Sequence, residues 1–191
     1  MELQHLIINC GSVKTKHFGE ILSQESLNYA IVTIEHLTEE HLKNADKIII
    51  SGAPILLTEV DPAPYLKKFE LLKTIDTPVL GVCFGHQILG MLEGGEIKRT
   101  TEARSLETIK QTSPSPLFHA IPQNSVFEED HCESVTLSDS FQLIAHSQSC
   151  ENEAMKHKTL NWWGVQFHPE VSEDYGTLLL QNWLNLCTTK G

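Results

Sequence analysis

A cysteine between two glycines, at the end of an apolar run, is the feature that most restricts how this chain can fold. The segment Gly81-Val82-Cys83-Phe84-Gly85 follows Pro78-Val79-Leu80. This pattern is typical of a nucleophile elbow, in which a strand ends, the reactive residue occupies a strained turn and a helix begins. Glycines are needed there because a β-carbon would collide with neighbouring backbone. Cys83 could instead be a small core side chain, but a core cysteine needs no flanking glycines.

A nucleophilic cysteine needs help to lose its proton. The helix predicted to begin at Phe84 directs free N–H groups and the positive end of its dipole toward the sulfur of Cys83, which favours the thiolate. A general base is also required, and the sequence must supply it from another segment.

His168 is the best candidate for this base. It ends the short alternating strand expected over residues 163–168, and Pro169 and Glu170 follow it. If the backbone stays extended through the proline, His168 and Glu170 lie on the same side. Glu170 can then orient the imidazole while the other ring nitrogen takes the proton of Cys83. The alternative is a strand-end histidine beside a solvated glutamate.

The order of apolar segments predicts an α/β fold. Continuous apolar runs at 47–50 and 79–82 indicate strands that are buried on both faces, as in a doubly wound parallel sheet with helices on both sides. Further strands are expected at 3–9 and 30–34, and helices at 15–27, from about 38, at 65–74, at 84–92 and at 174–187. After residue 95 the short strands at 105–109, 125–128 and 142–145 predict a small antiparallel extension.

Composition favours one globular enzyme domain over residues 1–191. The chain is 40% hydrophobic with a net charge of −11, which opposes nucleic-acid binding. From the sequence we expect neither a signal peptide nor a membrane span. Five cysteines without a C-x-x-C pair indicate a reducing cytoplasm, and no His/Cys cluster has the spacing of zinc ligands, so we expect no metal site. The cysteines are Cys10, Cys83, Cys132, Cys150 and Cys187.

Three segments together resemble the class I glutamine amidotransferases. They are residues 81–87, residues 164–170, and Ser51-Gly52-Ala53-Pro54 at the position of that family's oxyanion loop. They stand in the family's order, and the resemblance covers essentially the whole chain. It implies the flavodoxin-like α/β fold of the class I glutaminases.

The resemblance implies an activity and roles for individual residues. The side-chain amide of L-glutamine would be hydrolysed through a thioester on Cys83, without a cofactor, and His168 and Glu170 would complete a catalytic triad. Backbone N–H groups of Ala53 and Phe84 would bind the tetrahedral oxyanion. Ala53 stands where the family usually has a second glycine, so a backbone flip in this loop is expected to be harder here.

The same resemblance places the substrate. Gly52 and the side chain of Gln87 would contact the glutamine, and the segment 131–135 would lie against its amino-acid end through the backbone, which makes Cys132, Glu133 and Ser134 candidate contacts. Gln87 could otherwise be a polar residue on an exposed helix face.

Within the family, the order of motifs after residue 94 is most similar to the GMP synthase group. That group usually has Trp-Met-Ser-His-Gly-Asp around His131, whereas this chain has Glu128-Glu129-Asp130 before it and Cys132-Glu133 after it. We expect the ammonia to pass to a separate ATP-dependent synthetase subunit, a hypothesis motivated by the absence of a Gly-rich nucleotide-binding loop in this sequence.

Three alternatives stay open at this point. The chain could be a stand-alone hydrolase of γ-glutamyl amides or peptides. It could serve another amidotransferase, such as anthranilate or aminodeoxychorismate synthase. It could also be a catalytically silent regulatory protein on the same fold, although the presence of all three triad residues argues against that.

Overall fold

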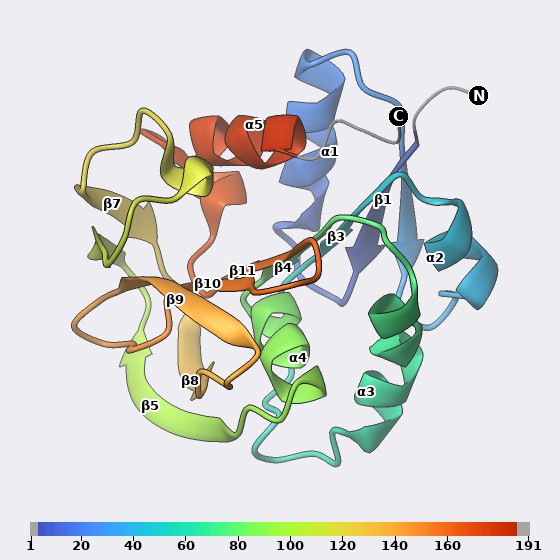
Figure 1. Cartoon of the computed structure of the whole chain (residues 1–191), viewed down its shortest axis with the longest axis horizontal. Coiled ribbons are helices and arrows are strands. Elements are labelled where there is room, and N and C mark those ends of the chain that lie inside the picture. Colours follow the sequence, from blue (N-terminus) through green and yellow to red (C-terminus); the bar gives the residue numbers. More distant parts are fainter. Residues whose placement is uncertain (1–3, 187–191) are drawn as a thin grey trace.

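The computed structural model describes residues 4–186 and centres on one nine-stranded sheet with helices on both faces (Figure 1). The first part of the sheet is parallel, in the flavodoxin-like order β2-β1-β3-β4-β11. These strands are β1 (His5–Asn9), β2 (Tyr29–Thr33), β3 (Lys47–Ile50), β4 (Val79–Val82) and β11 (Trp162–Val165). The doubly wound α/β fold predicted from the sequence is confirmed.

The helices divide between the two faces of this sheet. α1 (Thr15–Gln24) and α5 (Gly176–Leu186) share one core with strand side chains such as Ile7 and Leu80. The other core contains α2 (Glu39–Asn44), α3 (Ala63–Phe69) with the 3₁₀ turn η1 (Glu70–Thr74), and α4 (Phe84–Leu92). Ile8 and Val79 belong to this second core. Alternate residues of each strand therefore enter opposite cores, which explains why the apolar runs are continuous.

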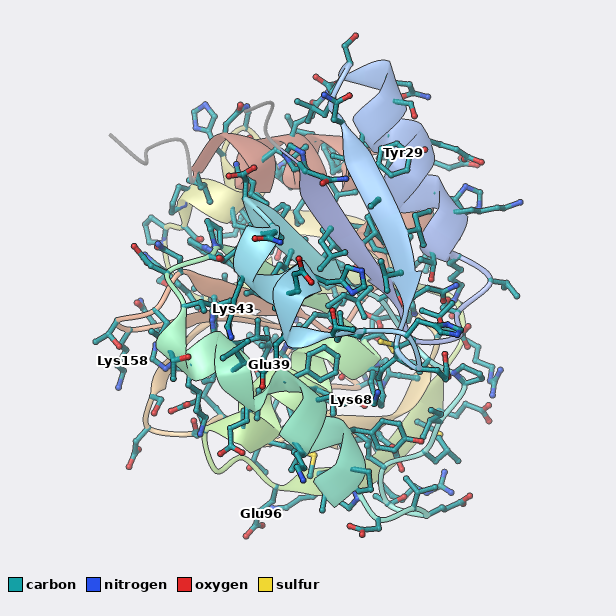
Figure 2. All side chains as sticks on the ribbon, turned by 90° about the vertical axis from the view of Figure 1, so that its right-hand side faces the viewer. Tyr29, Glu39, Lys43, Lys68, Glu96 and Lys158 are labelled. Carbon is teal, nitrogen blue, oxygen red and sulfur yellow. The ribbon has the colours of Figure 1, made fainter. Side chains whose placement is uncertain are left out.

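Local sequence accounts for the elements at the open edge of the sheet (Figure 2). Thr38 caps α2 by accepting a hydrogen bond from the backbone of His41, and Lys43 pairs with Glu39 one turn away at 2.9 Å. On the edge strand β2, the ring of Tyr29 lies against Gly19 of α1, where an added β-carbon would come within 2.9 Å of the ring. The small residue therefore lets helix and strand approach closely.

Antiparallel strands continue the same sheet beyond β11. Their order is β10-β9-β6-β7, with β6 (Leu106–Gln111), β7 (Asn124–Glu128), β9 (Phe141–His146) and β10 (Ala154–His157). A separate two-stranded sheet pairs β5 (Ile97–Ala103) with β8 (His131–Val135). The short 3₁₀ turns η2 (Pro116–Phe118) and η3 (Pro169–Val171) complete the connections.

Predicted and observed element boundaries agree best around the elbow. The strands at 47–50 and 79–82 and the helix at 84–92 agree residue by residue, whereas the helix predicted at 65–74 divides into α3 and η1. The predicted extension is antiparallel as expected, but the sequence did not predict β5, β8 or β10. The start of the first predicted strand at residue 3 and the end of the last helix at Cys187 lie outside the described residues. No helix within residues 4–186 is both long and apolar enough to cross a membrane.

Candidate active site

Cys83 occupies the strained turn between β4 and α4 that the sequence predicts. Its backbone has φ +52° and ψ −104°, a conformation that costs free energy for a residue with a side chain. A β-carbon on Gly81 would lie 2.5 Å from the backbone of Gly85, and one on Gly85 would lie 2.3 Å from the carbonyl oxygen of Ile50. The two glycines therefore let strand, turn and helix approach closely enough to form the elbow.

His168 reaches the elbow from the neighbouring parallel strand. β11 pairs with β4 in a register that sets Val165 opposite Val82, and the N–H of Cys83 donates to the carbonyl of Val165 at 2.9 Å. The chain then leads to His168, whose own N–H donates to the carbonyl of Glu128 at 2.8 Å. Backbone hydrogen bonds thus fix both ends of the Cys83–His168 pair.

The carboxylate of Glu170 orients the imidazole of His168. Nδ1 of His168 lies 2.8 Å from Oε1 of Glu170, and both side chains are buried. The sequence analysis expected extended backbone from His168 through Pro169 to Glu170, and this expectation is wrong. The strand ends at Val165, and Glu170 lies in the 3₁₀ turn η3. Pro169 begins that turn, and the turn brings the two side chains together.

The environment of His168 raises the pKa of its imidazole to about 10. Burial alone lowers this pKa, because a buried cation loses its hydration. Hydrogen bonds to Cys83 and Glu170, together with the charges of those two groups, outweigh burial and favour the protonated ring. Cys83 and His168 therefore form a contact pair in which the imidazolium is the stable form at neutral pH.

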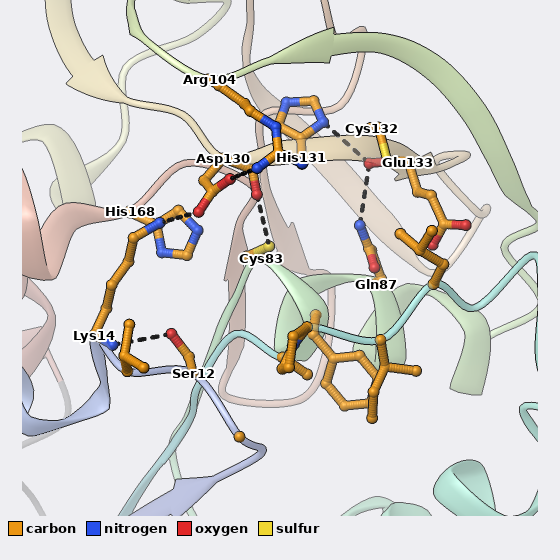
Figure 3. A pocket seen from close by; sticks show the side chains of 17 residues that line it. Ser12, Lys14, Cys83, Gln87, Arg104, Asp130, His131, Cys132, Glu133 and His168 are labelled. Carbon is orange, nitrogen blue, oxygen red and sulfur yellow. Dashed lines mark hydrogen bonds and ion pairs between the residues drawn. The ribbon is translucent and has the colours of Figure 1, made fainter.

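Cys83, His168 and the loop after β3 meet at a cavity of about 430 Å³ (Figure 3). Gly52 of that loop packs beside the pair, since a β-carbon there would lie 3.1 Å from Cε1 of His168 and 3.6 Å from Cβ of Cys83. Ala53 and Phe84 both line the cavity. Phe84 is the first residue of α4, so its N–H has no acceptor within the helix.

Glu133 ties this loop to β8. Its carboxylate accepts hydrogen bonds from the N–H groups of Leu57 at 2.8 Å and Thr58 at 3.0 Å, and from the hydroxyl of Thr58. The side chain is buried, with 2% of its surface exposed. One carboxylate therefore satisfies three donors of the loop that carries Gly52 and Ala53.

Replacing Glu133 by glutamine is expected to lower the free energy of unfolding by about 1–3 kcal/mol, because an amide accepts through one oxygen and leaves buried donors unpaired. Urea denaturation measures this loss, and amide hydrogen exchange at Leu57 and Thr58 should become faster. Glu59→Gln is the matched control, since Glu59 is exposed and pairs with Arg99 instead. Equal stability of the two variants would contradict the role given to Glu133.

Of the other residues predicted to contact the substrate, some line the cavity and some do not. Gln87 is buried and donates its amide hydrogens to the carbonyl of Glu133 at 3.1 Å and to Oε1 of Gln166 at 3.2 Å, so the alternative of an exposed helix face is wrong. Its contact with the substrate stays a prediction. Cys132 lines the cavity and accepts a hydrogen bond from Arg99 at 3.2 Å. Ser134 and Gly52 are not among the residues that line the cavity.

A group of charged residues at the cavity mouth was not predicted from the sequence. Asp130 pairs with Lys14 at 2.5 Å and with Arg104 at 3.4 Å, and its carbonyl oxygen lies 3.9 Å from the sulfur of Cys83. Burial opposes ionisation of Asp130, but the hydrogen bond and charge of Lys14 lower the pKa of this carboxyl. The three residues come from three separate connections, and no local pattern links them.

Comparison with known proteins gives one consistent family. The model of the family described as glutamine amidotransferase class-I matches residues 6–186. One subunit of the glutamine-hydrolyzing GMP synthase of Methanocaldococcus jannaschii is 34% identical over 154 residues, which cover 79% of this chain and 79% of that protein. The protein of the same name from Methanococcus maripaludis strain DSM 14266 is 34% identical over 187 residues, covering 95% and 96%.

Solved structures show the same fold. A protein of Thermoplasma acidophilum superposes with a TM-score of 0.89 at 23% identity, covering 98% of this chain and 94% of that one. A glutamine amidotransferase from Thermotoga maritima superposes with a TM-score of 0.79 at 19% identity, covering 97% and 82%.

Proposed function

This chain belongs to the glutamine amidotransferase class-I family, and we propose that Cys83, His168 and Glu170 catalyse its hydrolysis of glutamine. One observation carries the assignment of roles. The imidazole of His168 contacts the thiol of Cys83 and holds the carboxylate of Glu170 at 2.8 Å from Nδ1, beside a cavity open to a small amino acid. This arrangement matches nucleophile, base and orienting carboxylate.

The chemistry follows from these roles. The thiolate of Cys83 attacks the side-chain amide carbon of glutamine, and a C–S bond forms while the carbonyl oxygen takes the negative charge. When the C–N bond breaks, the imidazolium of His168 gives its proton to the leaving nitrogen, and ammonia departs from a thioester. Water then attacks the thioester and loses a proton to His168. The thiolate leaves, and glutamate is released.

Two backbone N–H groups are proposed to stabilise the tetrahedral oxyanion. The N–H of Phe84 is free at the start of α4, and Ala53 lies across the cavity on the loop held by Glu133. Ala53 is not among the non-glycine residues with positive φ in the described chain. Loss of one such donor typically costs about 2.7–4 kcal/mol of transition-state stabilisation.

Glutamine is proposed to bind between the loop after β3 and strand β8. Gly52 leaves room beside Cys83 and His168, and Gln87 keeps its side-chain oxygen available because its amide hydrogens are already bonded. The backbone of Cys132, Glu133 and Ser134 is proposed to face the amino-acid end of the substrate. Cys132 and Glu133 line the cavity, which supports this placement.

The raised pKa of His168 makes activity depend on pH in a definite direction. The imidazolium donates the proton to ammonia, so kcat/KM should fall on the alkaline side as His168 loses its proton, with an apparent pKa near 10. Glu170→Gln removes a charge that raises this pKa, so the alkaline limb should move to lower pH by about 1–2 units. Glutamate release measured between pH 6 and 10.5 tests this.

The control for this prediction is Glu173→Gln. Glu173 is exposed and follows η3 closely in sequence, so its loss should leave the profile unchanged. An alkaline limb at the same pH in Glu170→Gln and in the unmodified protein would contradict the proposed charge effect on His168.

The ammonia acceptor is proposed to be of the GMP synthase type. The relatives at 34% identity carry the name of one subunit of a glutamine-hydrolyzing GMP synthase, and one of them matches over 95% of this chain. A protein named as one subunit implies another, so we propose that a separate ATP-dependent synthetase receives the ammonia from this chain and aminates XMP to GMP.

Reconstitution tests the acceptor. The chain mixed with a candidate synthetase, ATP, XMP and glutamine should form GMP, and Cys83→Ala should support GMP formation from added ammonia but not from glutamine. Glutamine-dependent GMP no higher than in the unmixed control would refute the acceptor. Faster turnover of a γ-glutamyl dipeptide than of glutamine would instead favour a stand-alone hydrolase.

We also propose that the chain is one glutaminase domain that works in the cytoplasm. The family model spans residues 6–186. Cys10, Cys83, Cys132 and Cys150 are free thiols, which fits a reducing compartment.

A further inference from the structure

A second group of ionisable side chains lies behind the wall of the catalytic cavity. Glu129 lies between β7 and β8, His131 opens β8, and Glu153 precedes β10. All three are buried, with exposed fractions of 3%, 7% and 0%. One ligand atom from each lies within 4.8 Å of the other two, and Nε2 of His131 is 3.3 Å from Oε2 of Glu129.

Most polar atoms in this cluster lack a hydrogen-bond donor from the rest of the described chain. Within the described residues, both carboxylate oxygens of Glu129, Oε2 of Glu153 and Nε2 of His131 are buried without one, and the two carboxyl groups can hydrogen-bond to each other only when one of them holds a proton. Oε1 of Glu153 accepts from the hydroxyl of Ser147 at 2.6 Å. Among the ion pairs of residues 4–186, neither carboxylate meets a lysine or an arginine. Buried carboxylates without donors are costly, so a bound cation would be a natural partner for them.

The orientation of His131 points to the same occupant. Its Nδ1 lies 3.1 Å from the carbonyl oxygen of Glu133, and because a carbonyl only accepts, Nδ1 carries the ring hydrogen. The lone pair of the neutral ring is then on Nε2, which faces the two carboxylates. Metal-binding histidines are commonly fixed in this way, by donation of the other ring N–H to a backbone carbonyl.

We propose that Glu129, His131 and Glu153 bind a divalent transition-metal ion. One imidazole nitrogen and two carboxylate oxygens form a donor set suited to Zn²⁺, with an open position left for water. His131 also lines the catalytic cavity, so the cluster lies directly beside the proposed glutamine site. The ion would join β8, which borders the proposed glutamine site, to the segments before β8 and β10.

The sequence does not reveal this site, and the reason is geometric. Histidines and cysteines at ligand spacing are the pattern that predicts a zinc site, and their absence led to the expectation of no metal. Here two of the three ligands are glutamates, and Glu153 approaches the others only through the pairing of distant strands.

The test is metal titration of the Cys83→Ala protein, in which the nucleophilic thiol cannot act as a ligand. After treatment with a chelator and buffer exchange, we expect one equivalent of Zn²⁺ to bind and to raise the thermal midpoint. Co²⁺ should give visible d–d bands without the near-ultraviolet band of a thiolate ligand. Added to the same background, Glu129→Gln and Glu153→Gln should each weaken binding at least tenfold.

Glu128→Gln is the matched control, because Glu128 is the adjacent carboxylate and is outside the cluster; it should bind Zn²⁺ as the parent does. Circular dichroism establishes that each variant is folded. Absence of Zn²⁺ binding to the Cys83→Ala protein would overturn the proposal and leave a proton shared by the two carboxylates. Equal binding by Glu129→Gln and Glu128→Gln, or a thiolate band with Co²⁺, would also overturn it by locating the ion elsewhere.

Discussion

Replacing Cys83 by alanine is expected to lower kcat for glutamine hydrolysis by at least about 10⁴-fold, because the thioester route is lost and only binding and oxyanion stabilisation remain. The fold should tolerate the change, since alanine keeps the β-carbon that already fits the elbow. Glutamate formation measures the activity, and urea denaturation measures the stability of the same preparation.

His168→Ala is expected to cause a loss of similar size. Cys83 and His168 act as one unit, so the double variant should have a kcat little lower than that of either single variant. A glutamine-derived chloroketone should label Cys83 in the unmodified protein and fail to label it in His168→Ala. A Cys83→Ala protein that keeps more than about a hundredth of the activity would refute the proposed nucleophile.

Gly85→Ala is expected to lower the free energy of unfolding by about 3 kcal/mol or more, a large part of the total stability of a typical domain. The added β-carbon would lie 2.3 Å from the carbonyl oxygen and 2.8 Å from Cβ of Ile50, so helix α4 must move away from β3. Urea denaturation gives the change in stability. Activity should fall as well, because that movement shifts the elbow.

Gly94→Ala separates this clash from a general effect of glycine replacement. Gly94 has φ +87° and no atom within 4 Å of an added β-carbon. Its replacement should therefore cost only the backbone strain, about 1 kcal/mol. If Gly94→Ala proves as destabilising as Gly85→Ala, close packing of α4 on β3 is not what the glycine at position 85 provides.

The elements around the elbow could be predicted because short-range sequence determines them. The apolar runs of β3 and β4 mark strands buried on both faces, and the two glycines mark the turn at Cys83. Contact between His168 and Glu170 was also within reach, since they are two residues apart. The predicted backbone conformation between them was wrong, because Pro169 begins a 3₁₀ turn instead of continuing the strand.

Strand β8 was missed because its inward side chains are polar. His131 and Glu133 point inward with Val135, so the apolar alternation that identifies a strand is absent. Strand β5 is polar along most of its length and, within residues 4–186, pairs with β8 alone. Both strands are defined by pairing with distant segments, which a local pattern does not record.

The polar groups beside the triad escaped prediction for a related reason. Lys14, Arg104 and Asp130 meet at the cavity mouth only after the fold is complete. Glu129 and Glu153 likewise come together only in the folded chain, in the buried cluster with His131. The acidic run at 128–130 was visible in the sequence as a departure from the family. The sequence alone could not show that Glu129 is buried, whereas Asp130 forms ion pairs at the cavity mouth.

Adjacent β4 and β11 set the spacing between sulfur and imidazole through their shared backbone ladder, in which the N–H of Cys83 donates to Val165. The connections that carry Lys14, Arg104 and Asp130 contribute nothing to that ladder. Insertions or altered charges in these connections can therefore change the surroundings of the cavity, while Cys83 and His168 keep their separation. The entrance to the cavity and the reacting pair can therefore evolve independently in such a molecule.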